Sequence, residues 1–492
     1  MKKSKKYLLI VLAFLIVLGG GIAVLQLTKA PETTDEESSG MPGSIVLIDR
    51  SLYDLKTVTF ELKGQSEPIT VEVSTDADNA LHYKLAGNSE KLPLKSTILQ
   101  GLGVYGYQLK AMKDLGVPDD LSQYGLEDPE LCITSVFNNG DQTKYYVGAS
   151  NPAGGRYVQL AGDDKLYTAS ISDTAFSTKK DMIDTSLIPV NTTTQSGAQA
   201  TITCTALKLG GENYDPEIII EQCDPQIHSH YLLKQPAQGQ GYYCNDDTVN
   251  NKIKATINFT AKEVMCVEPT AEQLAAYGLD HPKATMDFSM DILDGGTGEV
   301  QHETHRIQVS TRYSDGTYPA LIDDIPVVYA IPSSAVEGWY QVEPFSFRST
   351  FIILPMITEI SEIDVQTPER QHVFTLERKA QEADSTKYDY TVYNTEKQEL
   401  TYATFQKYYK TILGLTLLSD SEEAVSGDPL LRVTYRYYNG GQDEIAYYTS
   451  TENSRQCVAV LNGAVYGTVR KSTVDECFQH AANMENDICE MS

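Results

Sequence analysis

Two segments of this chain share one pattern, and such an internal repeat constrains the fold more strongly than any other feature of the sequence. The pattern is L-x-x-Y-G-L-acid-x-P, and it begins at Leu121 and again at Leu274. Glycine just after a helical turn can take the left-handed conformation, and a proline soon afterwards prevents the helix from continuing. The pattern therefore predicts the same helix stop in two similar units, a structural role for Tyr124, Gly125, Leu126 and Pro129 and for Tyr277, Gly278, Leu279 and Pro282.

A third, more diverged copy begins at Asp428 and Pro429 and lacks the Tyr-Gly-Leu triplet. In every copy an alternating apolar segment follows the proline, as in a strand with one buried face. In the first and third copies this segment ends in Asn-Gly, at residues 139–140 and 439–440, which is a strong signal of a hairpin turn. Further short strands follow in the same order in all three copies, so the chain is predicted to contain three related units.

Each unit also has a hairpin, a third strand and a helix before its proline. The spacing of apolar residues predicts helices at residues 96–115 and 402–413, helical patterns from Thr248 onward in the second unit, and a short last helix at 472–480. In the second unit, Thr270 and Gln273 form the pattern of a capping box. The predicted order in each unit is β-β-β-α-β-β-β.

An antiparallel sheet with helices on one face is an α+β arrangement. We therefore expect an α+β fold in which an N-terminal transmembrane helix is followed by three tandem repeats of sheet plus helix. The repeats are placed at residues 44–187, 188–345 and 346–492, the last being the diverged one.

The N-terminus has the composition of a membrane anchor. Four lysines among residues 2–6 precede an uncharged apolar run at residues 7–27, and roughly 20 such residues suffice to span a bilayer. Because lysines favour the cytoplasmic side, residues 1–27 are expected to be cytoplasmic lysines and an anchor in a single-pass protein of the cell membrane. The acidic residues 28–43 are then a flexible tether, and the body lies outside the cell.

A cleaved signal peptide is the alternative interpretation of the N-terminus. Residues 21–23, Gly-Ile-Ala, offer small side chains at the spacing of a cleavage site. The apolar run continues past this point to Leu27, which favours the uncleaved anchor. Both interpretations place the body outside the cytoplasm.

Charge and motifs argue against several functional classes. The formal net charge of −28 disfavours nucleic acid as a partner. The sequence contains no phosphate-binding loop and no nucleophile elbow. His302 and His305 lack the spacing that places two zinc ligands on one helical face, and His228 and His230 have no evident third ligand. We therefore expect no catalytic residue, no cofactor and no metal.

Eight cysteines are present without any C-x-x-C pair. Outside the cytoplasm disulfides are chemically permitted. Cys204 and Cys223 lie about equally far from a predicted turn at residues 213–214, so a cross-strand disulfide is compatible with the sequence, and so are buried thiols.

These motifs resemble the bacterial family known as domain of unknown function 4340 (DUF4340). The resemblance is carried by residues 124–129 with Gly148 and the strands from Tyr157 to Tyr167, and again by residues 277–282 with Tyr318 and Tyr329. Segments 181–187 and 348–353 look like the connectors between its repeats. The resemblance implies one N-terminal anchor, no assigned catalytic residues, and partnership with ABC-type exporters and gliding-motility-like auxiliary proteins. The third copy and the cysteine content depart from the family pattern.

Together these features predict a non-enzymatic, membrane-anchored extracytoplasmic protein. We expect it to be an accessory or scaffold subunit of a membrane assembly such as an ABC-type transporter, with the membrane contacted through residues 7–27 and other proteins bound by the body. The alternative is a module that binds cell-envelope glycan or lipid through exposed tyrosines. An enzyme is the third and least favoured class.

Overall fold

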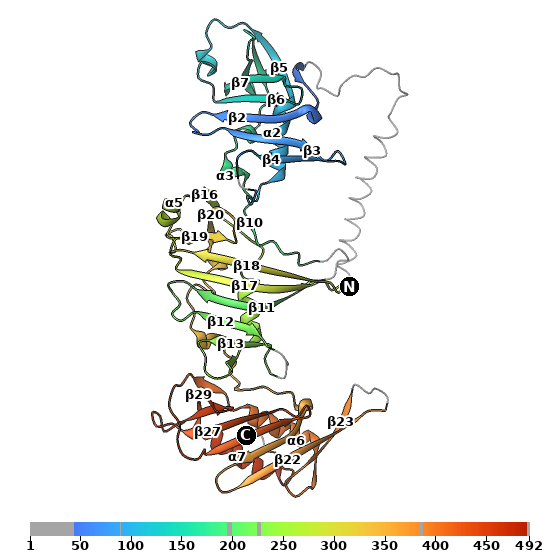
Figure 1. Cartoon of the computed structure of the whole chain (residues 1–492), viewed down its shortest axis with the longest axis vertical. Coiled ribbons are helices and arrows are strands. Elements are labelled where there is room, and N and C mark those ends of the chain that lie inside the picture. Colours follow the sequence, from blue (N-terminus) through green and yellow to red (C-terminus); the bar gives the residue numbers. More distant parts are fainter. Residues whose placement is uncertain (1–43, 89, 194–198, 224–227, 383–386, 490–492) are drawn as a thin grey trace, which may run out of the picture. The chain divides into compact units, whose positions relative to one another are not determined.

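The computed structural model describes residues 44–88, 90–193, 199–223, 228–382 and 387–489. In this part of the chain most of the regular structure is antiparallel sheet (Figure 1). The helices are α2 (Ser96–Tyr107), α3 (Lys179–Met182), α4 (Asp246–Lys254), α5 (Ala271–Ala276), α6 (Tyr402–Leu413) and α7 (Lys471–Met484). The expected α+β class is therefore wrong: the described part of the protein is mainly β.

None of the helices in the described residues is long and apolar enough to cross a membrane. The expected anchor at residues 7–27 and the tether at residues 28–43 lie outside the described residues.

Three nine-stranded sheets follow one another along the chain. The first has the strand order β1 (Ile45–Asp49), β5 (Gln108–Gly116), β9 (Leu166–Ala169), β8 (Arg156–Leu160), β7 (Gln142–Ser150), β6 (Leu131–Phe137), β2 (Leu55–Leu62), β3 (Ile69–Thr75), β4 (Leu81–Leu85). The second has the order β16 (Glu263–Val267), β20 (Val327–Pro332), β19 (Thr317–Ile322), β18 (Val300–Val309), β17 (Ala284–Leu293), β11 (Thr201–Gly210), β12 (Ile218–Gln222), β13 (Tyr231–Gln235), β14 (Tyr242–Tyr243).

The third sheet repeats the order of the second. Its strands are β25 (Leu417–Ser419), β29 (Ala464–Arg470), β28 (Gln456–Leu461), β27 (Gln442–Thr449), β26 (Leu431–Tyr437), β21 (Ile360–Gln366), β22 (Gln371–Ala380), β23 (Tyr388–Tyr393), β24 (Glu399–Leu400). A separate ladder joins β10 (Ser186–Leu187) to β15 (Phe259–Thr260). The second and third sheets thus match strand for strand. The first sheet differs at its two ends: β1 is extra, and no strand follows β4 in the order.

The chain divides into two compact units that do not follow the sheets. The first comprises Met1–Leu55, Glu61–Gln65 and Tyr105–Ser172, and the second comprises Lys56–Phe60, Ser66–Val104 and Asp173–Ser492. The second unit contains β3, β4 and most of α2 together with the whole second and third sheets. The edge of β4 and its counterparts in the other two repeats all lie in this second unit.

One predicted helix is only half helical. The sequence predicts a helix at residues 96–115, but α2 ends at Tyr107 and β5 begins at Gln108. Ala111 of β5 pairs with Ile45 of β1 on one side and with Ala169 of β9 on the other. Ladder hydrogen bonds on both sides satisfy the backbone as fully as a helix would. The predicted helix at residues 402–413 is confirmed as α6, and the predicted last helix lies within the longer α7.

The repeated Tyr-Gly-Leu motif ends a helical turn in both copies. Gly125 and Gly278 each have φ of 69°, the left-handed conformation that the motif predicts. In the second copy the turn belongs to α5, whose Thr270–Gln273 capping box is present. In the first copy it is a single 3-10 turn at Ser122–Tyr124. A Cβ atom at Gly278 would lie 2.5 Å from Ser310 Oγ, so this glycine is required for a close approach as well.

The only tryptophan of the chain lies in the core beside the second sheet. Trp339 is 1% exposed, and its Nε1 donates a hydrogen bond to the Ala335 carbonyl oxygen at 2.7 Å. The hydroxyl of Tyr214 donates to the carbonyl oxygen of Trp339. These contacts join the segment after β20 to the turn between β11 and β12.

Replacing Gly278 with alanine tests the helix stop. A left-handed backbone costs an L-residue about 1–2 kcal/mol, and the added carbon would also meet Ser310 Oγ. We expect the free energy of unfolding, measured by urea denaturation, to fall by more than about 2 kcal/mol. Gly298→Ala is the matched control, because Gly298 has φ of 78° and open space around it. Equal losses in the two variants would contradict the close-approach explanation.

Candidate functional site

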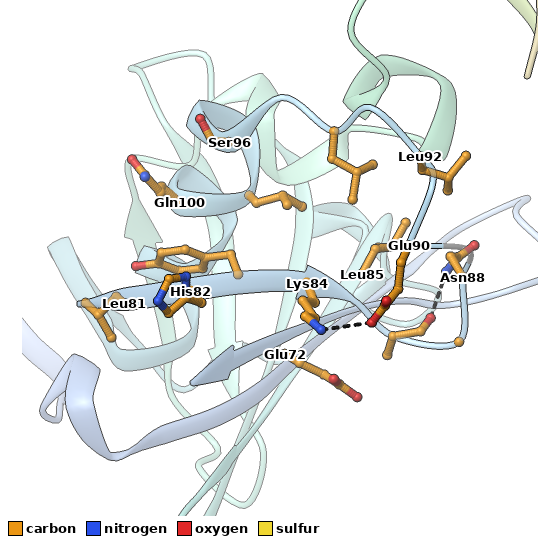
Figure 2. A pocket seen from close by; sticks show the side chains of 15 residues that line it. Glu72, Leu81, His82, Lys84, Leu85, Asn88, Glu90, Leu92, Ser96 and Gln100 are labelled. Carbon is orange, nitrogen blue, oxygen red and sulfur yellow. Dashed lines mark hydrogen bonds and ion pairs between the residues drawn. The ribbon is translucent and has the colours of Figure 1, made fainter. Parts of the chain in front are cut away.

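A cavity of about 730 Å³ lies beside the outer edge of β4 in the first repeat (Figure 2). One wall is β4, the second is formed by residues 86–88 and 90–94, and the third is the first turns of α2. We call this space the β4 groove. Five leucines supply its apolar surface: Leu81, Leu85, Leu92, Leu94 and Leu99. The polar residues around them are mostly exposed, among them Lys84, Glu90, Ser96 and Gln100.

Polar contacts at the rim of the groove are weak ones. Lys84 Nζ lies 3.0 Å from Glu90 Oε1, and both side chains are largely exposed (Figure 2). Surface ion pairs of this kind contribute about 0–1 kcal/mol. The rim can therefore rearrange around a ligand at small cost.

The ring of Tyr83 closes one part of the groove against α2. A Cβ atom at Gly103 would lie 2.8 Å from a ring carbon of Tyr83. Glycine at this helical position therefore allows the strand and the helix to approach each other. Leu99, on the same helix, is buried beneath them.

The register of β4 shows which backbone groups face the groove. Ala86 N donates to Thr70 O at 2.8 Å, and the ladder pairs Glu72 with Lys84. Because hydrogen-bonded pairs alternate along an antiparallel ladder, Lys84 directs its N–H and C=O groups toward β3. Tyr83 and Leu85 direct theirs to the outer side, where β4 is the last strand of its sheet.

The same edge is covered in the other two repeats. In the second repeat Tyr242 of β14 lies opposite Leu233 of β13, and in the third repeat Leu400 of β24 lies opposite Val392 of β23. The covered strands resemble β4 in sequence, since His82-Tyr83-Lys84-Leu85 corresponds to His230-Tyr231-Leu232-Leu233 and to Asp389-Tyr390-Thr391-Val392.

Matching contacts identify the segment of the first repeat that corresponds to β14. Lys95 N donates to Met182 O and Asp184 N donates to Pro93 O, at 2.8 and 2.7 Å. In the second repeat Asn245 N donates to Phe347 O and Ser349 N donates to Tyr243 O, at 2.8 and 2.9 Å. Pro93 thus occupies the place of Tyr243, and Leu92 the place of Tyr242. Leu92 nevertheless forms no ladder pair with Leu85, so the edge that β14 covers in the second repeat borders a groove in the first.

The residues singled out from the sequence do not meet in one place. Tyr124 packs its ring against Tyr157 with 4.9 Å between ring centroids, and Gly148 approaches the Tyr124 carbonyl. Leu279 packs with Cys266 and Val328. Asp428 and Pro429 precede β26. Each set supports its own repeat, and none lines the β4 groove.

No disulfide joins Cys204 to Cys223. The Cys204 thiol donates to the Ala206 carbonyl oxygen at 3.4 Å, and the Cys223 thiol donates to that of Ser229 at 3.0 Å. The ladder of β11 with β17 has a register shift between Cys204 and Ala206, and Cys223 lies beyond the end of β12. Symmetry about the turn was therefore not sufficient to predict a bridge. Burial raises the pKa of the Cys204 thiol to about 12.

Each histidine singled out from the sequence contacts one or two carboxylates. His302 Nδ1 lies 2.5 Å from Asp291 Oδ1, whereas His305 lies between Asp323 and Glu303, at 3.0 and 3.2 Å. His228 and His230 contact different residues, Asp443 at 2.9 Å and Asp246 at 2.5 Å. Within the described ranges, no group of three or more histidine, cysteine or acidic side chains is arranged to hold a metal ion.

A pH-dependent stability measurement tests the environment of His305. Burial disfavours its charged form, but hydrogen bonds with Asp323 and Glu303 outweigh burial and raise its pKa. This stabilisation is present below the unfolded pKa of about 6.5 and is lost as the pH rises through the higher folded value. We expect the loss of unfolding free energy in His305→Gln to be greater at pH 5.5 than at pH 8.5.

His302→Gln is the control for this experiment, because the His302 side chain is 77% exposed, against 16% for His305. It should change the unfolding free energy little at either pH. A His305→Gln effect that is constant with pH would contradict the argument.

Comparison with known proteins agrees with the repeated architecture. A family model described as a domain of unknown function, DUF4340, matches residues 88–209 and 237–419. Both matched regions begin shortly before corresponding helices, α2 and α4. No curated protein and no solved structure matches the chain. Because the two regions together cover more than half of the 492 residues, the chain belongs to the DUF4340 family.

Proposed function

We propose that this protein is a non-enzymatic accessory or scaffold protein that acts outside the cytoplasm and binds other proteins of a membrane assembly, such as an ABC-type transporter. The observation that carries this proposal is the β4 groove, which combines the last strand of a sheet with a cavity lined by both leucines and polar side chains. Sheet edges and apolar grooves are surfaces on which proteins bind extended segments of their partners. The net charge of −28 supports protein partners over nucleic acid.

Support for a location at the membrane comes from the sequence. Lysines at positions 2, 3, 5 and 6 and the apolar run at residues 7–27 have the composition of an N-terminal anchor. In this proposal the N-terminus is cytoplasmic, and the sheets are presented on the outer side, where they can contact the outer portions of membrane proteins.

The distribution of tyrosines supports protein binding over glycan binding. Stacking on sugars requires tyrosines gathered on an open face, but six of them are fully buried: Tyr145, Tyr231, Tyr329, Tyr408, Tyr435 and Tyr447. The exposed ones, Tyr53, Tyr313 and Tyr388, lie in different repeats. The fully buried tyrosines are therefore explained by the cores of the repeats.

Affinity purification tests the partner class. The tagged full-length chain, cross-linked in cells and extracted in detergent, is expected to recover permease or ATPase subunits of a transporter reproducibly. A tagged, unrelated acidic protein with its own N-terminal anchor serves as the control. Recovery of the same proteins by both baits, or of no transporter subunit in repeated experiments, would contradict the proposal.

Protease treatment of intact cells tests the location. If the body lies outside the cytoplasm, added protease should remove it while a cytoplasmic marker stays intact. Detection should use antibodies against the third repeat, since this part is far from the N-terminus in sequence. A body that is cleaved only after the cells are lysed would contradict an extracytoplasmic location.

A further inference from the structure

We propose that the β4 groove binds an extended segment of a partner protein as an additional antiparallel strand, with a bulky apolar side chain opposite Leu85. This inference rests on the proposed function and specifies how one contact with a partner is made. It follows from comparing three sheets that share the same strand order except at this edge and at the opposite end, where the first sheet has the extra strand β1.

The other two repeats show what fits at this edge. Both carry a two-residue antiparallel strand there, and each strand has one buried side chain, Tyr242 at 9% exposure or Leu400 at 6%. These side chains lie opposite Leu233 and Val392, the counterparts of Leu85. The preferred ligand therefore has an extended backbone with tyrosine or leucine at the corresponding position.

The backbone of β4 is oriented to form this ladder. Leu85 directs its N–H and C=O groups away from β3, as the alternation of hydrogen-bonded pairs requires. On the corresponding outer edge in the second repeat, the N–H group of Cys244 donates a hydrogen bond to the carbonyl oxygen of Tyr231 at 3.0 Å. A segment bound along β4 would form the same ladder.

The side chains of β4 leave room for such a strand. His82 and Lys84 are exposed on one face of the sheet, whereas Tyr83 and Leu85 lie on the opposite face, toward α2. Both faces of β4 contribute to the lining, because His82 and Lys84 also border the cavity at its rim, together with Glu72 and Glu90. The cavity of about 730 Å³ falls within the range of roughly 300–1,000 Å³ found for ligand sites.

The tether of this chain is a poor candidate for the occupant. Residues 28–43 read TKAPETTDEESSGMPG and contain neither tyrosine nor leucine, and four of the sixteen are acidic. Their proline, glycine, serine and acidic residues have low strand propensity. A segment of another protein is therefore the occupant that we infer.

A synthetic peptide copied from residues 238–245 of this chain, with Cys244→Ser, is the probe, because it contains the β14 sequence that fills the corresponding edge. We expect saturable binding of the fluorescently labelled peptide to the full-length protein in detergent, followed by anisotropy. On binding, the amide of Leu85 should gain protection from hydrogen exchange. Absence of saturable binding at peptide concentrations up to about 1 mM would overturn the proposal. A dissociation constant of about 1 mM corresponds to a binding free energy of about −4 kcal/mol.

N-methylated peptides separate strand pairing from general apolar binding. In the β13–β14 ladder the N–H groups at positions 242 and 244 face the neighbouring strand, whereas the N–H of Tyr243 faces away and donates to the Tyr466 hydroxyl. N-methylation at position 242 or 244 should weaken binding at least tenfold, and at position 243 less than twofold. Equal effects at all three positions would overturn strand addition.

Gln100→Trp tests the location of the binding site. Gln100 is exposed and lines the groove, so a tryptophan there should fill it and weaken peptide binding at least tenfold. Gln123→Trp is the control, because Gln123 is also exposed but lies outside the groove. Both variants should unfold at the temperature of the parent protein. Unchanged binding to Gln100→Trp would overturn the assignment, since the peptide would then bind elsewhere, for example at β13.

Hydrogen exchange without peptide distinguishes the other occupants. Slow exchange of the Leu85 amide in the peptide-free protein would mean that the edge is already covered. If the exchange rate does not depend on protein concentration, the chain's own N-terminal segment covers the edge. If the exchange rate falls with rising concentration, a second copy of the chain covers it. Either result would overturn the proposal. Recovery of transporter subunits by the Gln100→Trp variant would leave the proposed function standing while removing this groove as the contact.

Discussion

The backbone hydrogen-bond ladder is the interaction on which this protein depends. All three large sheets are antiparallel, and the apolar side chains of their strands pack together in the cores. A ladder has two ends, and the backbone groups at each end must be satisfied by water, by another part of the chain or by a partner. The repeats are otherwise similar, and they differ in what lies beside the strand at this end of the sheet.

Internal repetition makes that comparison unusually direct. The second and third repeats cover the strand after the central hairpin with a short segment that leads into α4 or α6. The first repeat has the same strand and the same helix, but its connection runs along the far side of a cavity. Strand order, local sequence and connector contacts all identify the uncovered edge as the counterpart of the two covered ones.

Local features were predictable from the sequence where short-range chemistry decides them. Gly278 takes the left-handed conformation and Thr270 forms its capping box with Gln273, because both depend only on neighbouring residues. The segment after Tyr107 was predicted as helix and is a strand, since its pairing partners are distant in sequence. The β4 groove has a different reason for escaping a reading of the sequence: strands of two residues, such as β14, are too short to show a periodic pattern.

Trp339 has a practical consequence for studies of this protein in solution. As the single indole of the chain, and one enclosed beside the second sheet, it makes emission a local reporter of that region. Fluorescence and a probe of total secondary structure will give coincident transitions only if the second repeat loses its structure together with the others. Disagreement between the two signals would reveal that the repeats unfold independently of one another.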